Sequence, residues 1–485
     1  MSDNDKYFES DEFKEILERY ESARQAGETP YFDPEDLTDI AEYYYELGDV
    51  ASAVEAADQA VRMFPGAAEP LAFRARMALH VDNDTRLAKK YIDQIDDETH
   101  PEYHYVKAEL MIFRKQYDKA EAFLEEQFEA IDDEEEREDF IIDVAMLYAD
   151  YDLYEKAAKW LRRATETDDP DYKELCGRIA MHRGNYEESE RIFNELIDTD
   201  PYSTPYWNHL ASAQFMHNNI RDSIQSSEFS IAINPNNADA ILNKANGLFS
   251  LGNFKEARKF YKRFCELCPQ EESGEMFQGI CYLNMDEPEK GIRHLKKAEE
   301  IAPEDSENLF EIYQELAFTL SRLGKTDEAL EYAEKMLTTP NGAHDEALVM
   351  KAHLLMEAKQ WAEAQACYSQ AIIESGGSAH IFLRVAISIY DLGYYDHAYR
   401  LFRMLDKLSD DDRSEGFAYE ALCCYSLGKK KEFREAVRKA CERNPREAAI
   451  VLCDLFPEEV EPKNYYDYLV SNEERGAMSE MNYEL

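Results

Sequence analysis

The chain has 485 residues and a formal net charge of −48 at pH 7, because 102 acidic residues outnumber 54 basic ones. An excess of negative charge on this scale repels nucleic acid and anionic membrane surfaces, so the composition argues against both as partners. Hydrophobic residues make up 44% of the chain and aromatic residues 12%, which is too many for a disordered protein.

Residues 1–33 are predicted to form an acidic segment with one helix. Phe13, Leu17 and Tyr20 fall on one face of the stretch Asp11–Ala26, which favours a helix that caps the following repeats over a docking segment. The N-terminus has no apolar leader and no run of about 18 apolar residues occurs, so we expect neither a secretory signal nor a membrane span.

The nine cysteines are scattered along the chain and odd in number. This usage fits free, buried thiols in a reducing compartment better than a disulfide framework. Together with the lack of a leader, it predicts a cytoplasmic protein.

Residues 34–445 repeat one pattern every 34–36 residues. A turn residue and a proline recur 17 positions apart, as Gly48 and Pro65, Gly184 and Pro201, Asn218 and Pro235, Gly252 and Pro269, and Gly428 and Pro445. Asn can replace Gly because it also tolerates positive φ. Each unit is predicted to hold two amphipathic helices, for example over Ala238–Leu251 and Lys255–Leu267, and the proline ends the second.

Smaller signatures recur in the same register. An aromatic residue follows the turn by two positions and a small residue comes three later, as in Phe254 and Ala257, and one unit carries Trp207-x-x-Leu210-Ala211. This pattern resembles the tetratricopeptide repeat (TPR) family, whose unit is a 34-residue helix–turn–helix. The resemblance implies an all-α fold, an α-α superhelix (solenoid) of about twelve antiparallel helix pairs over 34–445, whose first helices line a concave groove.

One acidic run interrupts the repeats. Seven of the eight residues of Asp132–Asp139 are acidic. A helix start or solvated linker is favoured, because acidic side chains suit a helix N-terminus. A landing site for a basic partner is the alternative.

Counting back from each turn projects one set of first-helix residues onto the concave side. The early repeats contribute acidic residues, namely Glu35, Asp39, Glu42, Glu46, Glu109, Asp139, Asp143 and Asp150. The central repeats contribute a predicted peptide-binding groove of Asn208, Phe215, Met216, Asn243, Asn246, Phe249, Met276 and Phe277. Amides can bind a peptide backbone and apolar residues can anchor its side chains. The carboxylate clamp of the family needs Lys and Arg partners that the flanking repeats lack.

Cys265-x-x-Cys268 has the spacing of redox dithiols and of half a zinc site. Both cysteines are expected at the end of a second helix, where the helix dipole disfavours a thiolate. A zinc site needs two further ligands, of which only Cys281 is a candidate. Buried structural thiols are therefore predicted, with no metal and no cofactor.

The C-terminal repeat has the opposite charge. Lys429–Arg446 carries eight basic residues against three acidic ones. A charged outer helix face is favoured, and the alternative is an electrostatic dock for an acidic partner, for instance the acidic front of another copy. That dock would comprise Lys429, Lys430, Lys431, Arg434 and Arg438.

Two capping helices are predicted over 446–471, at Arg446–Phe456 and Pro462–Val470, and a frayed tail over 472–485.

No phosphate-binding loop, metal-binding helix motif or nucleophile elbow occurs, so no catalytic residue is predicted. We expect a non-catalytic scaffold or adaptor for protein or peptide partners. The alternatives are a self-associating assembly factor, and a sensor or enzyme with an unrecognised site.

Overall fold

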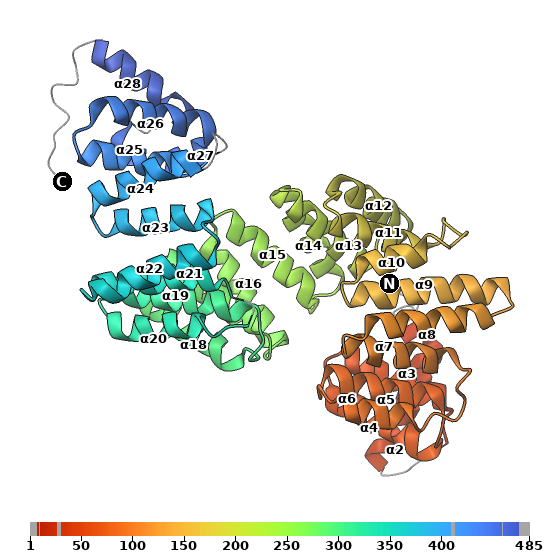
Figure 1. Ribbon diagram of the computed structural model, residues 1–485. Coiled ribbons are helices and arrows are strands. Elements are labelled where there is room, and N and C mark those ends of the chain that lie inside the picture. Colours follow the sequence, from red (N-terminus) through yellow and green to blue (C-terminus); the bar gives the residue numbers. More distant parts are fainter. Residues whose placement is uncertain are drawn as a thin grey trace. The chain divides into compact units, whose positions relative to one another are not determined.

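The computed structural model describes residues 7–8, 10–26, 31–340, 342–408, 413–457 and 459–474. Within these ranges the chain is all-α, as predicted, with helices α2–α28, two short 3-10 helices and no strand (Figure 1). The chain divides into two compact units, Met1–Asn253 and Phe254–Leu485. Each unit is described by itself below.

The first unit begins with α2 (Asp11–Ala26) and continues with antiparallel pairs, each made of a first helix, a short turn and a second helix. These pairs are α3 (Pro34–Glu46) with α4 (Val50–Met63), α5 (Ala68–His80) with α6 (Thr85–Ile92), α7 (Pro101–Phe113) with α8 (Tyr117–Ala130), α9 (Glu134–Asp150) with α10 (Tyr154–Leu161), α11 (Pro170–His182) with α12 (Tyr186–Thr199), and α13 (Thr204–Met216) with α14 (Ile220–Ile233). The unit ends with α15 (Ala238–Ser250), which packs on α14.

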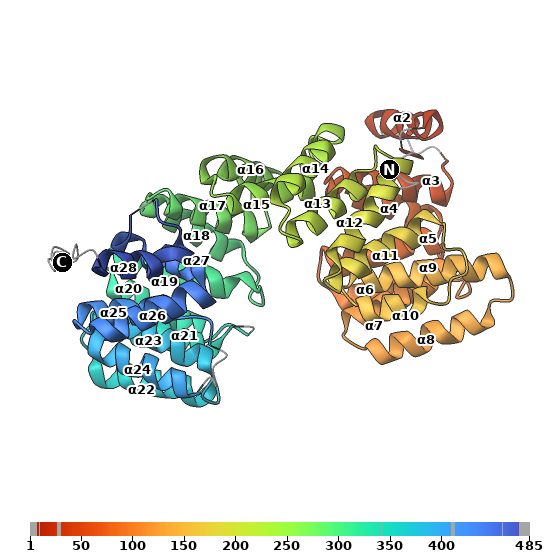
Figure 2. The same ribbon diagram turned by 90° about the horizontal axis from the view of Figure 1, so that it is seen from above.

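The second unit begins with α16 (Phe254–Leu267), which packs on the next first helix. The pairs that follow are α17 (Glu272–Asn284) with α18 (Pro288–Ile301), α19 (Asn308–Arg322) with α20 (Thr326–Met336), α21 (His344–Glu357) with α22 (Trp361–Glu374), α23 (Ala379–Asp391) with α24 (Tyr395–Leu408), and α25 (Phe417–Ser426) with α26 (Lys430–Arg443). Figure 2 shows the helices of this unit from a second direction.

One backbone feature is shared by all the turns between first and second helices. Each contains a residue in the left-handed region, namely Gly48, Asn83, Lys115, Asp152, Gly184, Asn218, Gly252, Asp286, Gly324, Lys359, Gly393 and Gly428. The chain reverses there because amides at the turn bond back to the first helix, as Gly252 N to Phe249 O at 2.8 Å and Asn253 N to Leu248 O at 2.9 Å. The predicted replacement of Gly by Asn is confirmed at Asn218, where φ is 65°.

Small residues let the two helices of a pair approach closely. The best example is the packing of α17 against α18, where a Cβ added at Gly279 would lie 2.8 Å from Leu295 Cγ and 3.1 Å from the carbonyl oxygen of Gly291. The alanines at the equivalent places, such as Ala211 and Ala245, have no exposed surface. These close approaches explain why the repeat needs a small side chain midway along each first helix.

Additional helices cover the two ends of the repeat array. Phe13 and Tyr20 of α2 are buried in one cluster with α3 and α4. At the other end α27 (Pro445–Val451), the 3-10 helices Cys453–Leu455 and Pro462–Asn464, and α28 (Tyr465–Glu474) cover α26. Helix α28 extends beyond the start of the tail predicted from residue 472, and 475–485 lie outside the described residues.

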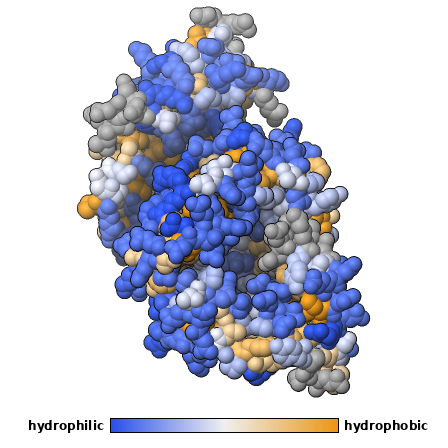
Figure 3. Space-filling model, turned by 90° about the vertical axis from the view of Figure 1, so that its right-hand side faces the viewer, coloured by the Kyte–Doolittle hydropathy of each residue, from blue (hydrophilic) through white to orange (hydrophobic). Residues whose placement is uncertain are grey.

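The surface is dominated by polar side chains. Figure 3 shows one face of the molecule, on which hydrophilic colours prevail and hydrophobic ones form separate spots. This agrees with a chain of which 32% is charged.

Candidate ligand grooves on the first helices

The first unit has a cavity of about 550 Å³ on its consecutive first helices α5, α7 and α9. Helix α9 supplies Asp143, Met146, Leu147 and Asp150, which follow the i, i+3, i+4, i+7 spacing of a single helix face. Helices α5 and α7 contribute in the same way. Their lining residues are Arg76, His80, Glu102, Tyr105 and Glu109.

Glu109 is the centre of the polar contacts in this cavity. Its carboxylate lies 2.7 Å from His80 Nε2 and 3.2 Å from Arg76 Nε, and it accepts a hydrogen bond from the Tyr151 hydroxyl at 3.1 Å. Burial alone would raise the pKa of Glu109, but the hydrogen bond from His80 and the charge of Arg76 lower it below the usual value. Glu109 therefore holds the arginine and the histidine at the wall of the cavity.

A second carboxylate of this cavity, Asp143, has a raised pKa, whereas the pKa of Glu109 is lowered. It accepts a hydrogen bond from the Tyr105 hydroxyl at 2.7 Å. Desolvation raises the pKa of Asp143, and the neighbouring carboxylates Asp139 and Glu102 raise it further. A cation from a ligand would relieve this repulsion.

An adjoining cavity of about 650 Å³ lies between α9, α11, α12 and the start of α13, and Met146 lines both cavities. Its wall includes Glu174, whose side chain is 16% exposed and lies 3.7 Å from His209 Nε2. Burial raises the pKa of Glu174 and lowers the pKa of His209 to about 4, so His209 is neutral at pH 7 and does not balance the carboxylate.

The second unit has its own cavity of about 370 Å³ on the first helices α19, α21, α23 and α25. It combines apolar residues such as Phe318, Val349 and Ile387 with the acidic residues Glu315 and Asp391. No residue of this cavity was predicted from the sequence. The signal that could have found it is the i, i+3, i+4, i+7 spacing of its lining residues on α21 and α23.

The projection of the acidic early repeats is supported at three positions. Glu109, Asp143 and Asp150 lie in one cavity. Arg76, His80 and Tyr151 complete that site but were not predicted from the sequence. The side chain of Glu46 lies outside the described residues.

Two members of the predicted central groove need correction. Asn208 is buried between helices, where its Nδ2 donates to Asn237 Oδ1 at 3.0 Å and its Oδ1 accepts from Ser230 Oγ at 2.8 Å. Met276 is only 1% exposed. Both residues lie ten positions before the turn residue of their pair, where the side chain points partly toward the second helix, so neither is available to a ligand.

The other predicted groove residues are at least partly accessible. Met216 is 54% exposed, and Phe215, Asn246 and Phe249 are half-buried. Asn243 Nδ2 lies 3.3 Å from Ser212 Oγ and 3.4 Å from the carbonyl oxygen of Asn208, so this amide bridges α15 to α13. In the second unit, the ring of Phe277 stacks on that of Tyr261, with centroids 5.2 Å apart. Their role in binding stays a prediction.

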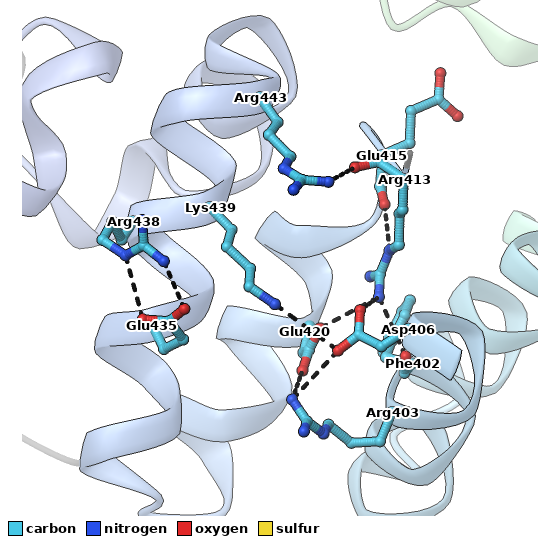
Figure 4. A network of polar contacts seen from close by, with 10 residues as sticks. All are labelled: Phe402, Arg403, Asp406, Arg413, Glu415, Glu420, Glu435, Arg438, Lys439 and Arg443. Atoms are coloured by element: carbon cyan, nitrogen blue, oxygen red, sulfur yellow. Dashed lines mark hydrogen bonds and ion pairs between the residues drawn. The ribbon is translucent and has the colours of Figure 1, made fainter. Parts of the chain in front are cut away.

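Two residues of the predicted basic dock, Lys429 and Arg438, already have partners within the protein, and the charge of Arg438 is balanced. Lys429 Nζ lies 3.7 Å from the centre of the Tyr399 ring. Arg438 forms ion pairs with Glu435 at 2.6 Å and with Glu442 at 2.8 Å, the first of which is drawn in Figure 4. Lys430, Lys431 and Arg434 are exposed. The remaining positive charge is therefore smaller than the sequence suggests.

The thiols and the acidic run have structural surroundings. Cys265 and Cys268 lie at the C-terminal end of α16, and burial raises the pKa of Cys265 to about 11. Over the described ranges no group of three or more His, Cys, Asp or Glu residues could hold a metal ion.

The acidic run starts α9, where Asp133 accepts hydrogen bonds from the amides of Glu135 and Glu136. In the same ranges, no helix is long and apolar enough to cross a membrane.

Three family models described as tetratricopeptide repeat match the chain, at residues 38–81, 238–271 and 310–339. These matches fall on α3 to α5, on α15 and α16, and on α19 and α20. No curated protein matches the sequence.

Solved structures are similar to the chain at low sequence identity. The Cut9–Hcn1 hetero-tetramer of APC/C is 13% identical over 83% of this chain and 76% of that one, with a TM-score of 0.43. MamA from Desulfovibrio magneticus RS-1 is 19% identical over 34% and 92%, with a TM-score of 0.32. YrrB, titled a TPR protein with an unusual peptide-binding site, is 16% identical over 37% and 90%, with a TM-score of 0.31.

Proposed function

Because this chain is a tetratricopeptide repeat protein, we propose that it is a non-catalytic scaffold whose first unit binds a segment of a partner protein along the first helices α5 to α13. The observation that carries this proposal is the pair of adjoining cavities on consecutive first helices, which share Met146. Clefts that bind peptides combine a few fixed polar groups with apolar walls.

The chemistry of the two cavities favours a polar segment with positive charge. Glu109 is already balanced by Arg76 and His80, but Asp143 and Glu174 have raised pKa values because nearby positive charge does not offset their desolvation. A lysine or arginine of the partner would supply that charge. The exposed part of the predicted central groove, including Met216 and Asn243, would extend the same binding face toward α15. The acidic charge and the free cysteines support a cytoplasmic site of action.

The proposal can be tested with matched charge reversals. Asp143→Lys/Asp150→Lys changes the cavity wall, and Glu126→Lys/Glu129→Lys makes the same change of charge on the exposed surface of the second helix α8. Circular dichroism must first show that both variants fold. Affinity purification with quantitative mass spectrometry should then show partners that the cavity variant loses and the α8 variant keeps.

A purified partner identified in this way should bind the parent protein in calorimetry and bind the cavity variant at least tenfold more weakly. If both variants retain every partner, the first-helix face of the first unit is not the binding site. If the chain captures only itself, the self-associating alternative is favoured.

A further inference from the structure

The cavity of the second unit has a chemistry of its own. Its lining comes from four consecutive first helices, α19, α21, α23 and α25, each of which contacts the next. On α21 it takes Glu346, Val349, Met350 and His353, and on α23 it takes Arg384, Ile387, Ser388 and Asp391. Both sets follow the i, i+3, i+4, i+7 spacing, so whole helix faces form the wall. This wall depends on no residue of the first unit.

The apolar part of the wall is incompletely covered. Val349 is 7% exposed and forms a floor with Met350 and Ile387, which are half-buried. Phe318 of α19 lines the same cavity with half of its surface (50%) exposed to solvent. A large apolar side chain placed against Phe318 and this floor would remove apolar surface of both molecules from water.

Two carboxylates that form no ion pair with a described residue lie beside that apolar surface. Among the described residues, Glu315 and Asp391 form no ion pair, whereas Glu346 is paired with His380 at 3.1 Å. Burial raises the pKa of Glu315, and the neighbouring Glu311 raises it further. Burial also raises the pKa of Asp391, because His353 and Arg384, which act to lower it, do not offset the desolvation. The basic side chains that line the cavity are Arg384, which is exposed, and His353, whose Nδ1 lies 2.9 Å from Ser388 Oγ.

We propose that this cavity binds a segment of a partner protein in which a large apolar side chain lies next to a lysine or arginine. Glu315 and Phe318 are one helical turn apart on α19, so their Cβ atoms are separated by about 5–6 Å. The apolar side chain and the cation of the partner must therefore be close neighbours in its sequence. A second copy of this chain is a poor occupant, because its net charge of −48 opposes approach to an acidic surface.

This inference goes beyond the proposed function, because it concerns a different surface and adds the requirement for an apolar anchor. The probe is a phage-displayed library of random 12-residue peptides, selected on the full chain. Enriched peptides should carry Leu, Met, Phe or Trp within four positions of Lys or Arg, because residues three or four apart are neighbours when the peptide is helical. A synthetic fluorescent copy of an enriched peptide should bind in anisotropy measurements, and replacing its apolar residue by Ser or its cation by Glu should abolish binding.

The protein variants locate the site. Phe318→Ser and Glu315→Lys should each weaken binding of that peptide at least tenfold, and Glu315→Gln should weaken it less than Glu315→Lys. Ile373→Ser on α22 and Glu331→Lys on α20 make the same chemical changes at exposed positions of second helices and should leave binding unchanged. Asp143→Lys/Asp150→Lys in the first unit should also leave it unchanged, which separates this inference from the proposed function.

Three outcomes would overturn the inference. The library could yield no binder, or binders rich in acidic residues. The cavity variants, shown by circular dichroism to be folded, could bind the selected peptide as tightly as the parent. Sedimentation could reveal a dimer that Phe318→Ser dissociates, which would make a second copy the occupant.

Discussion

The guanidinium of Arg413 forms an ion pair with the carboxylate of Asp406 at 2.8 Å, although the Arg413 side chain is only 5% exposed (Figure 4). The same Nη1 donates to the carbonyl oxygen of Phe402 at 3.1 Å, and Nε donates to that of Glu415 at 2.7 Å. Arg413 thus fastens the segment before α25 to helix α24.

Replacing this arginine should therefore destabilise the C-terminal repeat. Arg413→Met removes the charge that balances Asp406 and Glu420 in a buried place, and breaking such a pair costs about 3–5 kcal/mol. Hydrogen exchange followed by mass spectrometry should show faster exchange in α24, α25 and α26. Arg438→Met is the control, because the pairs of Arg438 are on the surface and contribute at most about 1 kcal/mol. Equal effects of the two substitutions would contradict this account.

Replacing the left-handed turn residue by glycine should stabilise the protein at turns that lack a glycine. Lys115 has φ of 57° and Lys359 has φ of 61°. This conformation costs a non-glycine residue about 1–2 kcal/mol, a cost that glycine avoids. Part of the gain is offset because glycine gives the unfolded chain more conformational freedom. Lys115→Gly and Lys359→Gly should each raise the free energy of unfolding by about 0.5–1 kcal/mol, as measured by urea denaturation.

The converse change supplies the control for these turns. A Cβ at Gly252 would meet no atom within 4 Å, so Gly252→Val probes only the backbone conformation with φ of 73°. A β-branched residue resists this region, and the variant should be less stable than the parent. A stable Gly252→Val protein would show that the turns tolerate any residue, and the expected gain at Lys115 and Lys359 would then have no basis.

These turns also show how far the sequence could be interpreted. Six glycines and Asn218 identified seven of the twelve turns, since few other residues adopt positive φ. Lysine and aspartate carry no such signal, and the turns at Lys115, Asp152 and Lys359 were located only through the aromatic residue two positions later and the small residue after it, as in Tyr117 and Ala120. The helix pairs were still predictable, because an amphipathic period of about 3.6 residues persists in the units without glycine.

The candidate site was less predictable than the fold. Counting from the turn located Glu109 and Asp143 in a cavity, but the same count placed Asn208 on the surface although it is buried. A rotation of one helix by a few tens of degrees decides whether such a residue faces the groove or the partner helix. That rotation depends on the packing of both helices, which a single-helix pattern does not contain. Arg413 is a similar case, because its partners come from α24 and α25.

Asp39 should make the stability of the first unit depend on pH. Burial raises the pKa of Asp39 from 3.8 to about 6, against a hydrogen bond from the Tyr7 hydroxyl that lowers it. The folded state therefore holds the Asp39 proton more tightly than the unfolded state, so the folded protein loses stability as the pH rises from about 4 to about 6, and the full loss is present above pH 6. Asp39→Asn should be more stable than the parent at about pH 7.5.

The difference between Asp39→Asn and the parent should shrink as the pH falls from about 6 to about 4, because the folded parent keeps the Asp39 proton while the unfolded chain has largely lost it. Urea denaturation at four pH values measures it, and the other carboxylates cancel in the comparison. A difference that grows on acidification would mean that the pKa of Asp39 is lowered in the folded protein.

The cysteines should behave as structural thiols. Burial raises the pKa of Cys265 to about 11 and that of Cys281 to about 12, so little thiolate is present at neutral pH. Iodoacetamide should modify the exposed Cys453 well before these two residues, as followed by peptide mass spectrometry. The purified protein should carry no stoichiometric zinc, and a chelator should leave its melting temperature unchanged. One equivalent of zinc, lost together with stability, would refute this assignment.

Within each unit, the helices from α3 to α26 pack mainly on helices one or two places along the chain. Synthesis on the ribosome delivers helices in the same order. When a helix pair emerges, the pair on which it packs has already been synthesised. Its own outer apolar surface is exposed only until the next pair has been synthesised. Apolar surface is therefore exposed only at the growing end of the nascent chain, one repeat at a time, however long the array becomes.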